Sequence, residues 1–205
     1  MRKNLIIVSL IVIGVIISGF TLVGFDTEFS PSIKQEAHIV PTEKELLEKT
    51  VNFPFTGNAF IGFKEALAFK ESQGKYHVVN TLGYLGKYQF GKSTLKRFNI
   101  TNTKDFLQNP VLQEDAFIAL CSVNKWILRK DIARSIGKTI QGIKITESGI
   151  LAAAHLAGAG NVKKFLRSNG KVSFEDAYGS SIKYYLKKFS GYNTSFIEAN
   201  RKPEV

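Results

Sequence analysis

The chain has a single cysteine, Cys121, among its 205 residues. It can therefore form no internal disulfide and must fold on its hydrophobic core alone. Cys121 lies in the apolar stretch AFIALCSVNKWIL, which has helical character and contains no neighbouring base. This context predicts a buried thiol and disfavours a Cys/His peptidase.

Histidine is almost as rare, with His38, His77 and His155 in the whole chain. Their spacing gives no H-x-x-x-H pair and no matching carboxylate, so the sequence predicts no metal site and no cofactor. His77 falls in a polar segment and is expected in a loop. His155 is equally compatible with a residue lining a cleft and with a buried histidine whose ring is hydrogen-bonded.

Acidic residues are also scarce, since 17 Asp and Glu stand against 28 Lys and Arg, for a formal net charge of +11. A basic surface favours polyanions such as nucleic acid, anionic lipid or the anionic polymers of a cell wall. The composition is 44% hydrophobic and includes 16 Phe, which is enough for a full core and excludes global disorder.

Charge is absent altogether between Leu5 and Phe25, and Arg2 and Lys3 precede this apolar stretch. The pattern predicts that residues 1–25 are a signal peptide or a transmembrane anchor, and the lack of an A-x-A cleavage site favours the anchor. Positive charge on the short leading side predicts export of the remaining chain, either anchored at the outer face of the membrane or secreted to the periplasm or wall. Export favours a cell-wall partner over nucleic acid.

The rest of the chain divides by composition. Residues 26–50 contain Pro31 and Pro41 without hydrophobic periodicity, which indicates a linker followed by a short charged helix. Residues 51–192 carry the helical patterns and are predicted to form the folded domain. Residues 193–205 are predicted to be a tail.

Helical patterns dominate the domain, and the expected fold is mainly α, with a small irregular β insert in the polar segment 73–91. Asn109 followed by Pro110 is typical of a helix start, and Ser173 with Asp176 resembles a cap before the last helix. The expected helices run from Asn58 to about Gly74, over residues 92–98, from Asn109 to about Lys130, from Thr146 to Gly158, from Asn161 to Gly170, and over residues 180–189.

Residues 86–93, GKYQFGKS, match the phosphate-loop pattern G-x-x-x-x-G-K-[ST]. A working phosphate loop lies between a buried strand and a substantial helix, with an acidic strand end nearby for magnesium. Here the preceding VVNTLGYL is a weak strand, and the following helix lasts barely two turns. We therefore expect a chance match and no bound nucleotide.

Glu71 ends an apolar helix face, because Phe60, Phe63, Leu67 and Glu71 follow one another at spacings of three, four and four. It also falls in the last turn of its helix. Burial and the helix dipole both favour the protonated carboxyl there, which a general acid at neutral pH requires. The alternative is an ordinary exposed glutamate paired with a lysine.

Three segments resemble the lytic transglycosylases and the lysozyme-like superfamily: ALAFKESQGKY (66–76), GYLGKYQFGKSTL (83–95) and AAHLAGAGNV (153–162). Members of this family carry E-S at the end of a buried helix, a G-[LRK]-[MY]-Q loop and an A-Y-N-A-G-x-G-x-V segment. GKYQF followed by NPVLQEDA is also similar to the transglycosylase-type phage endolysins. The likeness covers about residues 58–190 and implies a mainly α, lysozyme-like α+β fold.

The resemblance implies that Glu71 is the catalytic acid/base and that Ser72 steadies the active site. Gln89 corresponds to the glutamine of the family's loop, and Tyr88 and Phe90 are implied to line the cleft on either side of it.

Further substrate-binding residues implied by the resemblance are Gly158, His155 and Tyr185. His155 stands where the family has Tyr, and Leu156 where it has an Asn that helps to orient the substrate. Tyr185 corresponds to a late tyrosine that approaches the catalytic glutamate, with Tyr184 as the alternative.

The implied reaction cleaves the β-1,4 bond between N-acetylmuramic acid and N-acetylglucosamine in peptidoglycan strands. With Glu71 as the single acid/base and no cofactor, the C6 hydroxyl of the muramic acid attacks and 1,6-anhydro ends form. The differences at His155 and Leu156 leave open a lysozyme-like domain that binds glycan without cutting it.

Lysozyme-type hydrolysis of the same bond is the other alternative, and it would need a second carboxylate across the cleft. The nearby acidic candidates in the sequence are Asp105, Glu114 and Asp115. For Glu114 and Asp115, a solvated helix start accounts for the charge.

Overall fold

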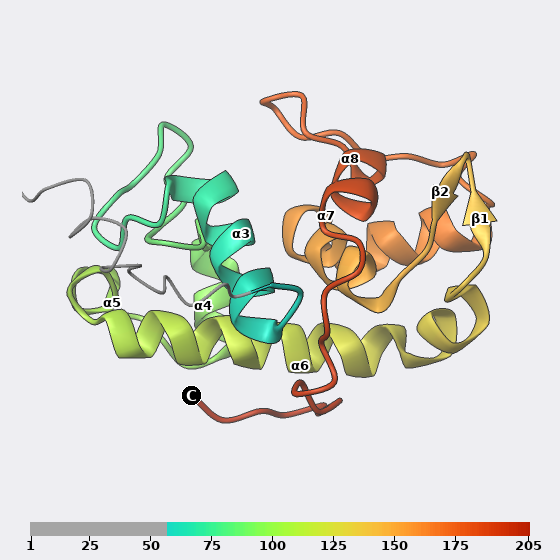
Figure 1. Cartoon of the computed structure of the whole chain (residues 1–205). Coiled ribbons are helices and arrows are strands. Elements are labelled where there is room, and N and C mark those ends of the chain that lie inside the picture. The colour runs from blue at the N-terminus through green and yellow to red at the C-terminus, as the bar shows by residue number, and fades with distance from the viewer. Residues whose placement is uncertain (1–56) are drawn as a thin grey trace, which may run out of the picture. The chain divides into compact units, whose positions relative to one another are not determined.

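Helix α6 (Pro110–Ser135) is the longest element of the computed structural model, which describes residues 57–205 (Figure 1). Its start is set locally, because the Asn109 side chain accepts a hydrogen bond from the Leu112 N–H and Pro110 takes the first helical position. This confirms the predicted helix start. The helix continues past Lys130 to Ser135, and buried side chains occur along its whole length.

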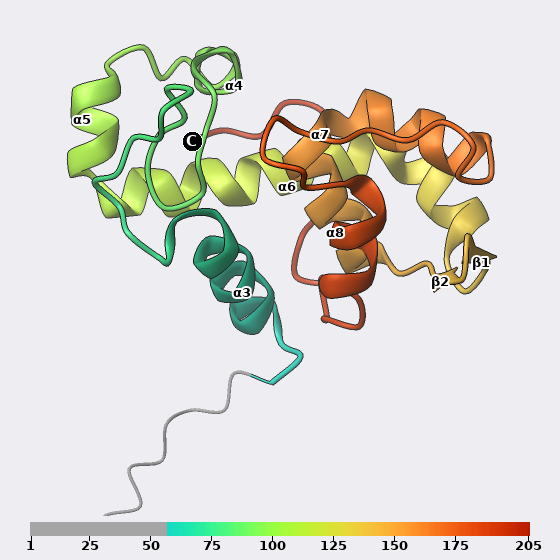
Figure 2. The ribbon, with the colours of Figure 1, turned by 90° about the horizontal axis from the view of Figure 1, so that it is seen from above.

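The other elements lie over the two halves of α6 (Figures 1 and 2). Over one half lie α3 (Phe60–Ser72), α4 (Lys92–Arg97) and α5 (Thr103–Gln108). Over the other half lie α7 (Glu147–Arg167), α8 (Ile182–Lys188) and a short antiparallel pair of strands, β1 (Thr139–Ile140) and β2 (Ile143–Lys144). One continuous group of buried side chains joins both halves, among them Phe63, Phe117, Phe165 and Tyr185.

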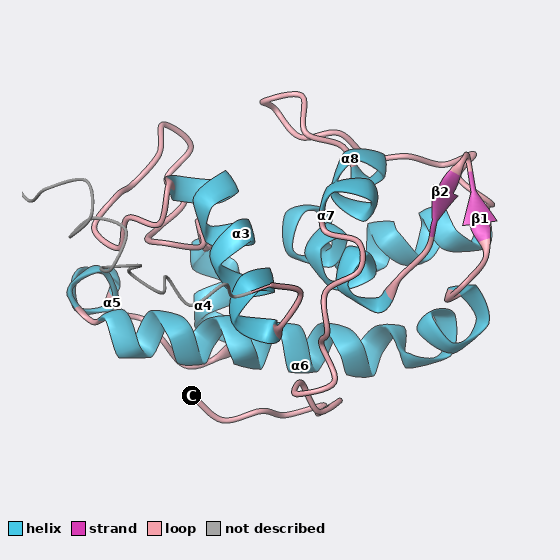
Figure 3. Cartoon of the chain, in the orientation of Figure 1, coloured by secondary structure: helices cyan, strands magenta, loops and turns pink. Residues whose placement is uncertain are grey.

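The described part of the chain is thus mainly helical with a small antiparallel sheet, as the sequence predicts (Figure 3). Along the chain, the two strands of the sheet come between α6 and α7, outside the segment 73–91 where the sequence predicts the β insert. In segment 73–91 there are isolated antiparallel bridges, which join Leu85 to Val79 and to Phe90. Tight turns in this segment leave too few consecutive extended residues for a strand.

Helix α7 begins as predicted, since the Thr146 side chain accepts a hydrogen bond from the Gly149 N–H. Gly158 interrupts the helix with φ 77° and ψ 149°, in agreement with the predicted break. The helical geometry resumes directly after Gly158, so Asn161 lies inside the second part and does not start it.

Two predicted caps are wrong. Ala59, not Asn58, occupies the N-cap of α3, and no side chain caps this helix. Ser181 caps α8 by accepting from the Tyr184 N–H, in place of the expected Ser173–Asp176 arrangement. Short polar residues bond to local backbone in turns as readily as at helix starts, which explains the misplaced caps.

The segment 193–205, predicted to be a tail, crosses α6 in Figure 1 and packs in part against the domain. Ile197 is buried, and the Phe196 ring stacks on Phe60 with centroids 5.1 Å apart. The Thr194 hydroxyl donates to Glu147 over 2.7 Å. This segment therefore belongs to the packed domain instead of forming a separate tail.

Within residues 57–205, no helix is both long and apolar enough to span a membrane. The predicted signal or anchor segment 1–25 and the predicted linker and short helix of residues 26–50 lie outside the described residues.

Helices α7 and α8 approach each other closely at Gly149. A Cβ atom at this position would lie 2.6 Å from the Leu186 carbonyl oxygen. The Leu186 atoms nearest to this Cβ belong to the backbone of a packed helix, so moving them aside would cost free energy.

We expect Gly149→Ala to lower the free energy of unfolding by about 2 kcal/mol, because the added methyl group forces α7 and α8 apart. Gly160→Ala is the matched control, since a Cβ there meets nothing within 4 Å. The control should stabilise the protein by about 0.5–1 kcal/mol through the lower entropy of its unfolded chain. Urea denaturation followed by circular dichroism measures both changes, and equal effects would contradict the close approach.

Candidate active site

Glu71 lies half-buried in the last turn of α3, at the end of a helix face formed by the buried Phe63 and Leu67. The helix ends there because Gln73 adopts a left-handed conformation with φ 58°. The N–H groups of Gln73 and Gly74 then bond back to carbonyls of the preceding turn. The side chain of Glu71 is thereby held at a helix end of defined geometry.

The Tyr185 hydroxyl of α8 donates a hydrogen bond of 2.7 Å to Glu71 Oε1. This agrees with the predicted approach of Tyr185 to the glutamate, whereas the neighbouring Tyr184 is 44% exposed. Burial and the negative charge of Glu71 raise the pKa of Tyr185 well above its usual range. The phenol therefore stays protonated and remains a hydrogen-bond donor to the carboxyl group.

Ser72 joins the end of α3 to residues 86–90, here called the 86–90 loop. Its hydroxyl donates to the Lys87 carbonyl oxygen over 2.7 Å and accepts from the Lys75 N–H over 3.0 Å. Because Ser72 follows Glu71 directly, this link sets the distance between the carboxyl group and the loop. The role of Ser72 in steadying an active site stays a prediction.

Gln89 sits at the tip of the 86–90 loop with φ 50°. Its backbone N–H and its side-chain Nε2 both donate to the Gly86 carbonyl oxygen, over 3.1 and 2.8 Å. Leu85 and Phe90 exchange two backbone hydrogen bonds of 2.9 and 2.8 Å and so close the loop. The GKYQFGKS stretch thus forms a tight turn that presents one glutamine side chain.

Tyr88 and Phe90 point away from Gln89 into the core. Tyr88 is fully buried, and its ring stacks on Phe117 with centroids 4.1 Å apart. Tyr88 therefore supports the loop from beneath and does not line a cleft, in contrast to the expectation. Phe90 is also buried, at 2% exposure, and reaches the edge of a surface hollow. The tight turn at Gln89 directs its two neighbours inward.

His155 supports the same loop from α7. Its Nε2 lies 2.8 Å from the Tyr88 carbonyl oxygen, and its ring meets the rings of Phe90 and Phe117 edge-on at about 6 Å. The carbonyl acceptor implies that Nε2 carries the proton. Nδ1 is buried and has no hydrogen-bond partner within residues 57–205. His155 borders surface hollows, as the first predicted alternative has it. The second alternative holds only in part, because the packed ring is hydrogen-bonded through Nε2 alone.

Three adjoining hollows of about 380, 350 and 470 Å³ form one groove, because they share lining residues. All three include Gln89. The first two share Glu71 and Asn80, and the last two share His155 and Leu156. The groove therefore passes from the end of α3, over the tip of the 86–90 loop, to α7.

At its far end the groove reaches Gly158, where the break in α7 exposes backbone, and Ser93 at the start of α4. Near its middle, the Thr81 and Tyr178 hydroxyls lie 2.7 Å apart and join two loops from the two halves of the molecule. Because it consists of three linked hollows, the groove suits a chain-like ligand better than a compact small molecule.

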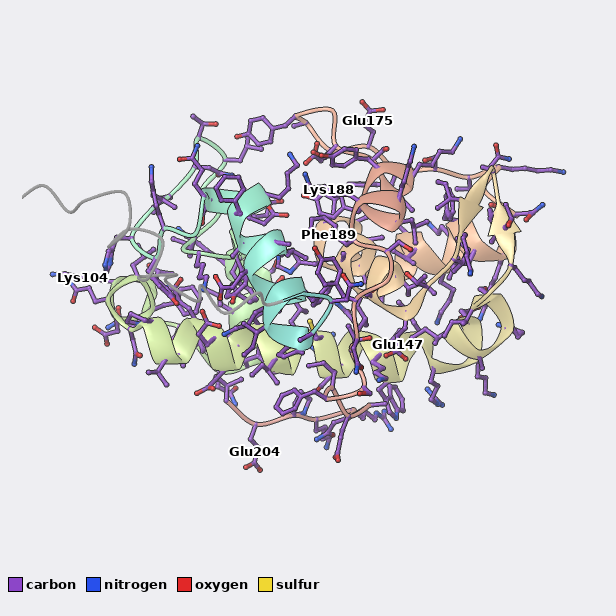
Figure 4. The ribbon with its side chains drawn as sticks, viewed as in Figure 1. Lys104, Glu147, Glu175, Lys188, Phe189 and Glu204 are labelled. Carbon is purple, nitrogen blue, oxygen red and sulfur yellow. The ribbon has the colours of Figure 1, made fainter. Side chains whose placement is uncertain are left out.

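Two further carboxylates, neither of which the sequence predicts at the site, line the same hollow as Glu71. Glu175 and Asp176 belong to the loop before α8, and Figure 4 shows Glu175 above that helix. Asp176 Oδ1 accepts hydrogen bonds from the Tyr178 and Ser180 N–H groups, over 3.0 and 2.7 Å. Glu175 is exposed. The one sequence signal that could have placed Glu175 and Asp176 at the site was their closeness to Tyr185 along the chain.

The acidic residues expected near the site lie elsewhere. Asp105 is exposed at the start of α5 and accepts a hydrogen bond of 2.6 Å from Asn102. Asp115 is exposed on α6. Neither residue lines the groove in the described part of the chain.

Glu114 is not a solvated residue of a helix start, as expected, but the centre of a half-buried polar cluster. Its Oε1 accepts from the Tyr76 hydroxyl and from Lys87 Nζ, over 2.7 and 2.8 Å. Its Oε2 accepts from Lys64 and from the Tyr88 hydroxyl. Residues Lys64, Tyr76, Lys87, Tyr88 and Glu114 are called the Glu114 cluster below. It joins α3, segment 73–91 and α6 beneath the 86–90 loop.

Burial and hydrogen bonding act in opposite directions on this cluster. Burial alone would raise the pKa of Glu114, but the four hydrogen bonds to its carboxylate lower the pKa to about 2. Burial alone would lower the pKa of Lys87, and its hydrogen bonds to Glu114 and Glu65 raise it above its usual range. Both groups are therefore charged across the physiological pH range.

We expect Glu114→Gln to lower the free energy of unfolding by about 2–3 kcal/mol at neutral pH, because Lys87 loses its buried counter-charge. The folded-state pKa of Glu114 lies below its ordinary value of 4.5, so this stabilisation is complete above that value and is lost as pH falls towards 2. Urea denaturation at several pH values should thus show the two proteins converging in acid. Asp115→Asn, on the same helix but exposed, serves as the control. A difference that is independent of pH would contradict this assignment.

Cys121 is buried as predicted, and its burial strongly raises the pKa of the thiol. Among residues 57–205, no three His, Cys, Asp or Glu side chains are grouped so that they could hold a metal ion.

A hollow of about 1050 Å³ lies between the end of α4 and the C-terminal segment. Its Trp126 ring is in contact with the Arg129 and Arg201 guanidinium groups, and no buried carboxyl group lines it. The groove beside Glu71 is therefore the candidate active site.

Searches against protein-family models, curated proteins and solved structures found no match to the chain. The resemblance to lytic transglycosylases rests on the three sequence segments, and the candidate active site rests on the geometry around Glu71.

Proposed function

We propose that the protein is a lytic transglycosylase with a lysozyme-like fold, which cleaves the β-1,4 bond between N-acetylmuramic acid and N-acetylglucosamine in peptidoglycan. The observation that carries this proposal is the hydrogen bond from buried Tyr185 to Glu71, on a long groove. A phenol that fixes one carboxyl oxygen leaves the other free to exchange a proton with a ligand.

Glu71 acts first as the acid. The Tyr185 hydroxyl occupies Oε1, and Oε2 has no hydrogen-bond partner in the described part of the chain. The transferable proton therefore resides on Oε2. It passes to the glycosidic oxygen as the bond from that oxygen to C1 of the muramic acid breaks and an oxocarbenium-like centre develops.

Glu71 then acts as the base. The C6 hydroxyl oxygen of the same muramic acid forms a bond to C1, and its proton returns to Oε2. The product is a 1,6-anhydro sugar, and no water is consumed. Tyr185 stabilises the carboxylate between the two steps, because it donates a hydrogen bond to the charged form.

Gln89 and Ser72 support substrate binding. The Gln89 Nε2 group is engaged with the Gly86 carbonyl, which leaves the amide oxygen to accept from a sugar hydroxyl or an acetamido N–H. Ser72 holds the loop that carries Gln89. The groove continues on both sides of Gln89, as binding of a glycan strand would require.

We further propose that the protein acts outside the cytoplasm, tethered by or released from its N-terminal apolar segment. The net charge of +11 would hold it against the anionic wall.

Hydrolysis of the same bond is the second candidate, because Glu175 and Asp176 line the hollow that contains Glu71. Either carboxylate could position a water or form an adduct opposite the acid. Asp176 accepts hydrogen bonds from two backbone N–H groups through Oδ1, and Oδ2 has no hydrogen-bond partner within residues 57–205.

Mass spectrometry of digested peptidoglycan tests the proposal. The native protein should release muropeptides one water lighter than hydrolysis products, and Glu71→Gln should reduce the rate by at least about 100-fold. Asp176→Asn should leave the anhydro products unchanged. Reducing ends that disappear with Asp176→Asn would instead establish a lysozyme, and no product from any form would indicate a binding domain.

Tyr185→Phe should lower kcat about 10- to 100-fold at unchanged KM, because the lost hydrogen bond stabilises a charge that forms during the reaction. The aromatic ring and its packing remain, so the melting temperature should change little. Tyr192→Phe, at a half-buried tyrosine that packs on Phe63, is the control. An equal loss in both variants would contradict a specific role for the Tyr185 hydroxyl.

A further inference from the structure

Two ammonium groups from different helices converge on one exposed aromatic ring beside Glu71. Lys70 Nζ of α3 lies 5.8 Å from the centroid of the Tyr184 ring, and Lys188 Nζ of α8 lies 5.5 Å from it. Within residues 57–205, neither lysine forms an ion pair with a carboxylate. These three residues are called the Lys70–Tyr184–Lys188 cluster.

The cluster borders the candidate active site through both helices. Lys70 immediately precedes Glu71 and lines the same hollow. The Tyr184 ring meets the Tyr185 ring edge-on at 5.9 Å, and the Tyr185 hydroxyl donates to Glu71. Lys188 lies near the face of α8 that is turned towards α3 in Figure 4. A group bound to the cluster would therefore lie next to a sugar bound at Glu71.

The chemistry of the cluster selects an anion with an apolar part. Two like charges held near one ring repel each other, and a carboxylate between them would offset this repulsion. The Tyr184 ring, 44% exposed, offers a flat surface on which an aliphatic group can pack. Neutral sugar rings alone would leave both ammonium groups without a counter-charge.

We propose that the Lys70–Tyr184–Lys188 cluster binds a carboxylate of the 3-O-substituent of N-acetylmuramic acid. The proposal rests on the proposed function, because it places a muramic acid at Glu71. The carboxylate belongs either to the lactyl group itself, in strands without peptide, or to the stem peptide attached to it. The cluster thereby selects the sugar that carries this substituent over N-acetylglucosamine.

Binding measured without cleavage tests the proposal. The full-length protein, kept in mild detergent and carrying Glu71→Gln, is titrated against fluorescent glycan strands, and anisotropy reports the affinity. Three probes are compared: strands with stem peptides, strands freed of peptides by an amidase, and a chitin oligosaccharide of the same length, which has no carboxylate.

Adding Lys70→Gln and Lys188→Gln should weaken binding of the carboxylate-bearing strands about 3- to 10-fold and leave chitin binding unchanged. The loss should shrink as salt is added. Weakening with peptide-bearing strands alone assigns the peptide carboxylate, because the lactyl carboxyl is an amide in those strands. Weakening with amidase-treated strands alone assigns the lactyl carboxylate, and weakening with both shows that the cluster accepts either carboxylate. Lys96→Gln with Lys104→Gln, at exposed lysines on α4 and α5, is the control with the same change in net charge.

Equal weakening for chitin, or a loss no larger than that of the control pair, would overturn the inference while leaving the proposed function in place. If the Glu71→Gln protein binds none of the three probes and the native protein releases no product, the proposed function fails and the inference falls with it.

Discussion

Glu114 accepts hydrogen bonds from α3 and from two parts of segment 73–91, and the geometry of the candidate site depends on this one carboxylate. Lys87, whose side chain is 5% exposed, can be buried as a cation because Glu114 and Glu65 compensate its charge. The Lys87 carbonyl in turn accepts the Ser72 hydroxyl, next to Glu71. The charged pair beneath the loop therefore helps to set the position of Glu71 relative to Gln89.

A second support comes from polar side chains that bond to the backbone of the loop. The Gln113 side chain accepts the Lys87 N–H over 2.8 Å and donates to the Phe106 carbonyl over 2.9 Å. His155 holds the Tyr88 carbonyl from the other side. These contacts hold the backbone beside Gln89, so this non-glycine residue can keep its left-handed conformation despite the cost in free energy.

Local signals made much of the fold predictable from the sequence. The cap at Asn109, the cap at Thr146 and the break at Gly158 each depend on a few adjacent residues, and each occurs as predicted. The pairing of Tyr185 with Glu71 spans 114 positions, so no periodicity could reveal it, and the resemblance to a family suggested it.

The predictions that were wrong concern residues whose positions are determined by tertiary contacts. Glu114 follows a helix start, where an exposed carboxylate is common, and only packing shows that four donors surround it. Tyr88 was expected in the cleft because it adjoins Gln89, but the tight turn reverses its direction. The sequence pattern around Asp176 predicts a helix cap, and its position in the same hollow as Glu71 follows from the fold of a loop with no repeating pattern.

The contact between Thr81 and Tyr178 has a consequence for how a polymer enters. Both residues are exposed at the tips of their loops, and a single hydrogen bond between hydroxyls joins them across the groove. Breaking such a bond in water costs about 1 kcal/mol, which thermal motion supplies readily. Under the proposed function, a glycan strand could therefore be laid into the groove sideways along its length, without having to be threaded from a free end.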